Sequence, residues 1–186
     1  MEFSEVVTRR RSVRKFDGRP LEDEALEYVL QAARVAPSAS NRQRARFVVV
    51  RDPAKLSVIG RRRTLADGRV INRWLTDAPA IIVACGERSG AATRYGVDWW
   101  QVDTSIATEH LVLAAVDIGL GTCWIGVFDE PVVRAELGIP AQFGILALIA
   151  IGYPAGQMSA SERMTRTLVR ADHRKPMTEL VHWDTW

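Results

Sequence analysis

The chain has 186 residues, of which 47% are hydrophobic, and a formal net charge of +3. This length suits one domain with a real core, and no stretch approaches the ~20 apolar residues needed to cross a bilayer. Its two cysteines, Cys85 and Cys123, form neither a disulfide framework nor a zinc motif. The first residues lack a basic start followed by an apolar run. We therefore expect a cytoplasmic protein with one domain over residues 1–186 and no metal.

The first half of the chain predicts helices around one strand. Apolar residues near the start predict a short helix that ends near residue 10. Apolar spacing with an acidic first turn predicts an amphipathic helix over residues 21–35, ended by Pro37. Residues 47–50 form a buried-strand candidate, and a basic helix is expected over residues 54–63. For residues 66–76 a helix is one alternative.

The second half adds two strands and a long apolar helix. Strands are predicted over residues 80–85 and 145–151, and a loop over residues 89–95. Residues 102–118 predict an apolar core helix closed by glycines, followed by a short mixed segment, 122–128. Asp129 is a candidate N-cap of a helix that ends near Gly138. The tail is polar to Arg174. Helices interleaved with β-rich runs around one sheet indicate an α+β or α/β class.

Residues 10–16 place four cations and a hydroxyl in one short run, Arg-Arg-Ser-Val-Arg-Lys-Phe. In an extended backbone Arg10, Ser12 and Arg14 share one face, and two guanidinium groups around a hydroxyl suit an anion such as phosphate. Arg11 points to the other side, where a surface role is equally open. By itself such a run is also typical of solvated surfaces and nucleic-acid patches.

Four separated segments carry the strongest functional signal through their order and spacing: residues 10–16, 37–43 (Pro-Ser-Ala-Ser-Asn-Arg-Gln), 119–126 (Gly-Leu-Gly-Thr-Cys-Trp-Ile-Gly) and 174–176 (Arg-Lys-Pro). Together they resemble the FMN-dependent nitroreductase family over nearly the whole chain. The resemblance implies an α+β fold, with a central mixed or antiparallel sheet flanked by helices. It also implies an intertwined homodimer with shared active sites.

The resemblance implies a set of cofactor-binding residues: Arg10, Arg11, Ser12, Arg14, Pro37, Ser38, Ala39, Ser40, Asn41, Gln43, Trp124, Ile125, Gly126 and Arg174. Arg10, Ser12 and Arg174 match ligands of the FMN phosphate. Arg14 matches a cation near the flavin N1 and O2, where it supports charge on the reduced ring.

Two further segments match the edges of the flavin ring. Residues 37–43 match a loop that edges O4 and N3 of the flavin bound mainly to the other subunit, although taken alone they also fit a plain helix-terminating turn. The backbone of residues 124–126 matches the N5 side, where a glycine permits close approach. Trp124 also fits a core or interface anchor.

The loop departs from the family after Gln43, because Arg44-Ala45 replaces the usual Pro-Trp. Alternation would place Arg42, Arg44 and Arg46 on one face, which would favour NADPH over NADH. The alternative is that these arginines are solvated and uninvolved. Asn72 and Arg73 match a stretch that touches the pyrimidine in some members.

Three other residues are not expected to act in catalysis. His110 fits a core or interface histidine, and Asp103 fits a residue that caps a helix. By resemblance to the family Cys123 has a cofactor-lining position, but nothing nearby marks it as a nucleophile. There is no G-x-G-x-x-G motif, so a nicotinamide nucleotide must visit the flavin directly.

The resemblance therefore implies an FMN oxidoreductase that works by a ping-pong reaction. Hydride passes from NAD(P)H through flavin N5 to an electron-poor acceptor: a nitroaromatic, a quinone or an activated alkene. No side chain is required as acid or base, because the cofactor does the chemistry. The expected partners are a second copy of the chain, whose surface receives the tail 180–186, and the small-molecule acceptor, with no nucleic acid or membrane.

Three alternatives stay open: a specialised relative such as a reductive dehalogenase or a flavin-consuming enzyme, an FMN-binding protein without turnover, and a basic nucleic-acid-binding domain. The last would use residues 9–15 and 61–63, but it lacks a recognition helix or stacking motif.

Overall fold

A computed structural model describes residues 1–60, 63–64, 70–71, 74–90, 93–94, 96–158, 160–168, 170–171 and 173–186. The chain divides into two compact units, residues 1–155 and 156–186, which are described separately. The expectation of one domain over residues 1–186 stays a prediction. No helix in the described part of the chain is both long and apolar enough to cross a membrane.

Among its described residues the first unit holds five α-helices: α1 (Phe3–Arg9), α2 (Asp23–Arg34), α3 (Pro53–Ile59), α4 (Trp99–Asp117) and α5 (Glu130–Leu137). Two 3-10 turns are η1 (Ala39–Asn41) and η2 (Leu75–Asp77). The main strands are β1 (Ala45–Val50), β4 (Ala80–Glu87), β7 (Gly121–Ile125) and β8 (Phe143–Gly152), and the short ones are β2 (Arg63–Thr64), β3 (Val70–Ile71), β5 (Thr93–Arg94) and β6 (Val97–Asp98).

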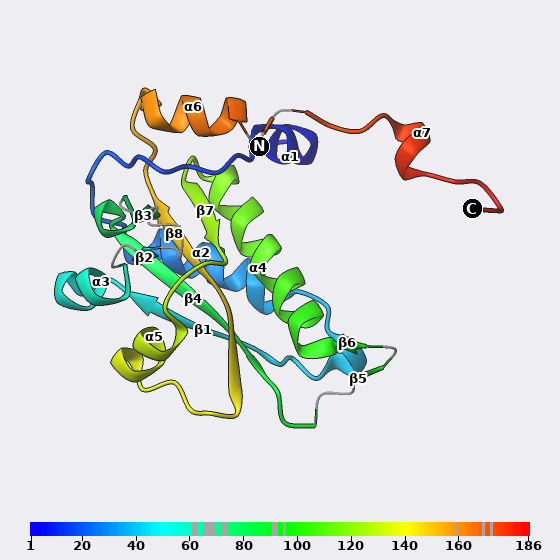
Figure 1. Cartoon of the computed structure of the whole chain (residues 1–186), viewed down its shortest axis with the longest axis horizontal. Coiled ribbons are helices and arrows are strands. Elements are labelled where there is room, and N and C mark those ends of the chain that lie inside the picture. Colours follow the sequence, from blue (N-terminus) through cyan, green and yellow to red (C-terminus); the bar gives the residue numbers. More distant parts are fainter. Residues whose placement is uncertain are drawn as a thin grey trace. The chain divides into compact units, whose positions relative to one another are not determined.

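The four main strands form one antiparallel sheet in the order β1-β4-β8-β7 (Figure 1). The central strand β4 pairs with β1 on one side and β8 on the other. Its side chains alternate between two cores, with Ile81 and Val83 in one and Ala80 and Ile82 in the other. Because both faces are covered, β4 and β8 read as continuous apolar runs rather than alternating ones.

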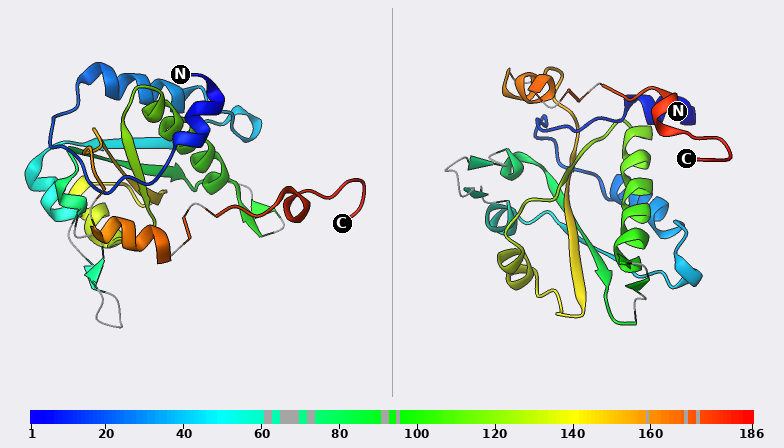
Figure 2. Two further views of the ribbon diagram at one scale, coloured as in Figure 1. Left: turned by 90° about the horizontal axis from the view of Figure 1, so that it is seen from above. Right: turned by 45° about the vertical axis from the view of Figure 1, so that its right-hand side comes forward.

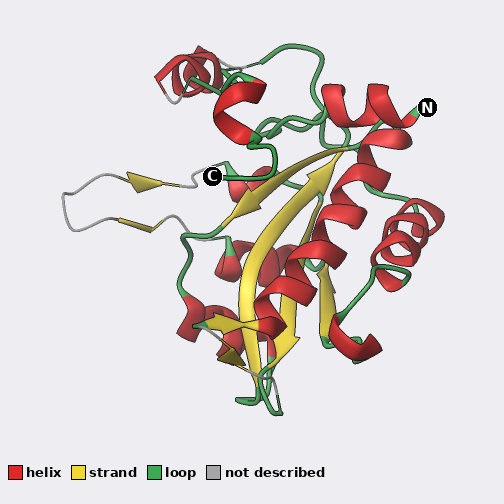
Figure 3. Cartoon of the chain, turned by 90° about the vertical axis from the view of Figure 1, so that its right-hand side faces the viewer, coloured by secondary structure: helices red, strands yellow, loops and turns green. Residues whose placement is uncertain are grey.

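Helices cover both faces of this sheet, giving three layers. On one face α2 and α4 pack on each other and on the sheet, and Figure 3 shows α4 running along that face. On the other face α3 and α5 pack through Leu56, Ile59 and Val133 (Figures 1 and 2). The fold is therefore α+β, as predicted.

Most predicted elements are confirmed, with shifted ends. The helix predicted over residues 21–35 is α2, the apolar helix over 102–118 is α4, and the three strand runs are β1, β4 and β8. Asp129 caps α5 by accepting a hydrogen bond from the Val132 N–H (3.3 Å), and Gly138 ends that helix with φ 62°.

Two predictions of local structure were wrong. The basic helix over 54–63 ends at Ile59, because Gly60 closes it, and residues 61–62 lie outside the described residues. The loop over 89–95 includes a strand, β5, which pairs with β6. The polar tail contains α6 (Ala160–Leu168), and α7 (Met177–Leu180) follows in the same unit. Much of residues 66–76 lies outside the described residues.

Candidate functional site

The arginine-rich run is an extended segment fastened to the edge of the sheet. Ser12 forms a parallel bridge with Thr122 of β7, and the Val13 N–H donates to the Thr122 carbonyl (2.8 Å). At the other end of the run, Phe16 bridges Pro154. Val13 and Phe16 are buried, whereas Arg10, Ser12 and Arg14 are half-buried. Two of the four predicted segments, 10–16 and 119–126, therefore lie side by side.

Gly121 makes this approach possible. A β-carbon at Gly121 would stand 2.6 Å from Val13 Cγ2 and 3.0 Å from Pro154 Cγ, inside van der Waals contact. The missing side chain lets the arginine-rich run lie flat against β7.

Arg10 lies within electrostatic range of α4. Burial raises the pKa of Glu109, while the charges of Arg10 and His110 act in the opposite direction. Both Glu109 and His110 are half-buried side chains of α4. Arg10 thus has a neighbouring carboxylate and remains partly accessible.

The end of β7 presents open backbone. Trp124 packs against the core on the α2 and α4 face, while Ile125 is buried in the opposite core. Gly126 follows, exposed, and a β-carbon there would have no atom within 4 Å. This open backbone suits close approach by a flat ligand.

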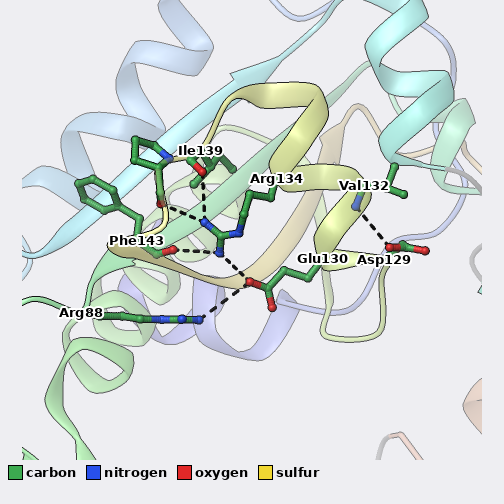
Figure 4. Close-up of polar contacts among 8 residues, drawn as sticks. Arg88, Asp129, Glu130, Val132, Arg134, Ile139 and Phe143 are labelled. Atoms are coloured by element: carbon green, nitrogen blue, oxygen red, sulfur yellow. Dashed lines mark hydrogen bonds and ion pairs between the residues drawn. The ribbon is translucent and has the colours of Figure 1, made fainter.

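The helix α5, which follows Gly126 in the chain, is held by a network of polar contacts that Figure 4 shows. Arg134 donates to Glu130 (2.6 Å) and to the carbonyls of Ile139 (3.2 Å) and Phe143 (3.0 Å). Arg88, at the end of β4, lies 3.9 Å from the same Glu130 carboxylate. The network joins α5 to the end of β4 and the start of β8.

The loop over residues 37–43 is more than a plain turn, because its backbone is strained. Ser40, Asn41 and Gln43 have φ of 51°, 53° and 50°. Left-handed backbone costs non-glycine residues roughly 1–2 kcal/mol each, less for Asn. Its exposed polar side chains interact, since Gln43 Nε2 donates to Asn41 Oδ1 (3.1 Å). Backbone strain of this kind clusters at functional sites.

The capping role predicted for Asp103 was wrong. The helix α4 begins at Trp99, so Asp103 lies one turn inside it, 2% exposed. Its Oδ1 accepts a hydrogen bond from the Ala39 N–H (2.8 Å), while Oδ2 is buried with no hydrogen-bond partner. An acidic residue on a buried face of an apolar helix was the signal that sequence reasoning missed.

Arg42, Arg44 and Arg46, which were predicted to share a face, differ in exposure. Arg44 is 5% exposed, and its guanidinium donates to the carbonyls of Ser89 (2.9 Å) and Gly90 (2.6 Å). Arg42 and Arg46 are exposed. The helical backbone of Arg42 and the positive φ of Gln43 interrupt the alternation that an extended segment would show.

Within one chain the loop and the arginine-rich run lie at opposite ends of α4 (Figures 1 and 2). The loop contacts Asp103 near the start of the helix and lines a cavity of about 320 Å³ with Ala107 and Phe47. The run lies toward the other end, beside β7. The described residues of a single chain therefore do not bring these two predicted segments together.

Two further predictions cannot be placed beside these segments. Arg174 belongs to the second unit, where its guanidinium donates to the carbonyls of Ala171 (3.0 Å) and His173 (2.8 Å). Its meeting with Arg10 stays a prediction. Asn72 and Arg73 lie outside the described residues.

The described residues fit FMN in three respects. Arg10, Ser12 and Arg14 are partly accessible on a fixed edge, as a phosphate and a pyrimidine edge require. Gly126 leaves open space beside the backbone, and the strained loop offers amide groups. Among the described residues, no group of three His, Cys, Asp or Glu side chains could hold a metal ion.

Comparison with known proteins matches the chain to the nitroreductase family over residues 7–153. The chain is 33% identical to a provisionally named NADH dehydrogenase/NAD(P)H nitroreductase of Archaeoglobus fulgidus, covering 94% of this chain and 98% of that protein. A solved nitroreductase family protein of Clostridium difficile aligns over 100% of both chains, with 31% identity and a TM-score of 0.78. A solved FMN-dependent nitroreductase of Clostridium difficile aligns with 29% identity and a TM-score of 0.74, covering 97% of this chain and 98% of that chain. This chain belongs to the nitroreductase family and has its α+β fold.

Proposed function

We propose that this chain is an FMN-dependent oxidoreductase that uses NAD(P)H to reduce an electron-poor acceptor, such as a nitroaromatic, a quinone or an activated alkene. The observation that carries the proposal is the pairing of the arginine-rich run with β7, which sets Arg10, Ser12 and Arg14 on the same sheet edge that ends at the open backbone of Gly126. The nicotinamide nucleotides in the relative's name and the FMN dependence of a structural neighbour support it.

Each part of this edge has a role in the proposal. Arg10 and Ser12 would hold the FMN phosphate, because a guanidinium pairs with phosphate oxygens through two hydrogen bonds. Arg14 would face the pyrimidine edge and stabilise negative charge there. When bound, FMN would supply hydride exchange between nicotinamide and acceptor. Gly126 would keep a side chain out of the way of both, and no acid or base is assigned.

We further propose a homodimer in which each site uses two copies of the chain. The helix α4 carries a half-buried stripe at helical spacing: Val102, Ile106, Glu109, Leu113 and Val116. A mainly apolar stripe of this kind is suited to a second helix. The 19 residues of α4 span about 28 Å, with the loop at one end and the arginine-rich run at the other. Antiparallel pairing of two α4 helices about a two-fold axis would carry each loop to the other copy's run.

The test of the function is direct. The purified chain, or its apo form with added FMN, is expected to show flavin absorbance that NADH or NADPH bleaches and a quinone or nitroaromatic restores. Protein that fails to bind FMN would contradict the proposal. Bound flavin that neither nucleotide reduces would indicate an FMN-binding protein without turnover. Irreversible loss of flavin under oxygen would favour a flavin-consuming enzyme.

Mixed dimers test the shared sites. One chain carries Arg10→Ala and a differently tagged chain carries Asn41→Ala with Gln43→Ala. If the loop serves the other copy, both defects fall in one site and the second site stays intact, so the mixed dimer binds half the wild-type flavin. If each loop serves its own copy, both sites are damaged and flavin is lost from both.

A further inference from the structure

We propose that Asp103 is a positioning residue for the cofactor, because its carboxylate holds the strained loop over residues 38–43 in its binding shape. The inference rests on the proposed function. Asp103 itself is buried at 2% exposure and is assigned no contact with FMN. It acts through the backbone of Ala39.

One peptide group links the carboxylate to the loop. The Ala39 N–H donates to Asp103 Oδ1 (2.8 Å), and the Ser38 carbonyl of the same peptide group accepts from the Asn41 N–H (2.9 Å). The Ser38 hydroxyl oxygen accepts from the Gln43 N–H (2.8 Å). Asp103 therefore fixes the peptide plane that holds the Asn41 N–H, and hydrogen bonds in such a chain reinforce one another. The side chain of Ser38, at the edge of the same peptide group, holds the Gln43 N–H.

These bonds end at strained residues. Asn41 and Gln43, whose N–H groups they hold, have positive φ, as does Ser40 just before Asn41. Without the hydrogen bond from Ala39 to Asp103, a loop with three left-handed residues would relax to more common backbone conformations. Its exposed amides would then lose their arrangement for the flavin edge.

The burial of Asp103 distinguishes it from a general stabilising residue. Its Oδ2 lies buried without a hydrogen-bond partner, a cost that an apolar residue at this position would avoid. Asp103 lines the cavity together with Ala107, one turn further along α4. The bond from the Ala39 N–H to its other oxygen gives this buried carboxylate a role that an apolar residue could not fill.

The experiment separates loop positioning from stability. Asp103→Leu keeps the approximate volume but removes the acceptor, and Asp103→Asn keeps an acceptor oxygen. Thr108→Ala is the matched control, because Thr108 is also buried on α4 but donates only to Thr104 of its own helix (2.7 Å). FMN affinity is measured by fluorescence titration of apo protein, and stability by urea unfolding of the same samples.

We expect Asp103→Leu to raise the FMN Kd at least tenfold without lowering the urea midpoint, with Asp103→Asn and Thr108→Ala within threefold of wild type. An unchanged Kd for Asp103→Leu would overturn the inference. So would an Asp103→Asn Kd as high as that of the leucine variant, or an equal rise in Thr108→Ala. If Asp103→Leu does not fold, Asp103→Ala replaces it with the same expected Kd. Wild-type protein that binds no FMN would instead refute the proposed function.

Discussion

Val13 lies against Gly121 so closely that a β-carbon on the glycine would stand 2.6 Å from Val13 Cγ2. This contact joins the arginine-rich run to β7, so the glycine determines where the proposed phosphate ligands lie. The same close contact makes Gly121 sensitive even to substitution by alanine.

Gly121→Ala is expected to lower the free energy of unfolding by about 1–3 kcal/mol, because overpacking displaces Val13 or Pro154. Urea unfolding of apo protein measures it. The control is Gly126→Ala, where a β-carbon meets open space, and stability should change little. FMN affinity should nevertheless fall in Gly126→Ala if the flavin approaches that backbone. Equal stability losses in the two variants would contradict the assignment of the close contact.

Arg10→Ala should weaken FMN binding by about 1.5–3 kcal/mol, the contribution of a charge-assisted hydrogen bond. Titration of apo protein measures the change, and the loss should be larger in the double variant with Ser12→Ala. Lys15→Ala removes an exposed cation from the same run and is the control for net charge. Wild-type affinity in the double variant would remove the phosphate cradle from the proposal.

Arg44→Ala is expected to act on stability rather than on nucleotide choice. Loss of the buried guanidinium leaves the Ser89 and Gly90 carbonyls without this donor, at a cost of about 1–3 kcal/mol. Thermal or urea unfolding measures the loss, and Arg42→Ala, which changes an exposed side chain, is the control. The ratio of kcat/KM for NADPH and NADH should be the same in Arg44→Ala and wild type; a shift toward NADH would restore a nucleotide role for Arg44.

Glu109→Gln should stabilise the apo protein in a pH-dependent way. Burial raises the pKa of Glu109 in the folded state, so the ionised form carries a penalty at neutral pH. The penalty is complete above the folded pKa, shrinks as the pH falls toward the unfolded value, and is absent below it. The variant should therefore exceed wild type in Tm at pH 7–8 and match it below about pH 4. Glu27→Gln, at an exposed position of α2, is the control. A gain independent of pH would show that ionisation is not its cause.

Deleting residues 180–186 should cost both the dimer and the flavin, if this tail packs on the other copy. Leu180, Trp183 and Trp186 are large apolar side chains left exposed in the single chain, with Trp186 fully so. Sedimentation is the measurement, with flavin content read from the same samples. A wild-type monomer of 20.7 kDa that still holds FMN would contradict the dimer.

Local elements followed from sequence because their causes are local. Residues 80–85 and 145–151 are almost all β-branched or otherwise apolar. Such a composition is typical of a strand that is buried on both faces, as β4 and β8 are. Asp129 and Gly138 mark the ends of α5 through a side-chain cap and a left-handed residue. The order of the four motifs also indicated the family that the comparisons show.

The arrangement of the candidate site depended on tertiary structure. The pairing of Val13 with Thr122 and the bond from Ala39 to Asp103 join segments far apart in the chain, and no periodicity encodes such pairs. The burial of Arg44 depended on two carbonyl acceptors in a turn that only the folded chain brings near. Sequence by itself predicted helices α1 to α5, the strands β1, β4 and β8, and the residue types of the site, but not the strand β7. Folding decided which of those residues meet, because long-range hydrogen bonds and strained backbone form only when distant elements pack together.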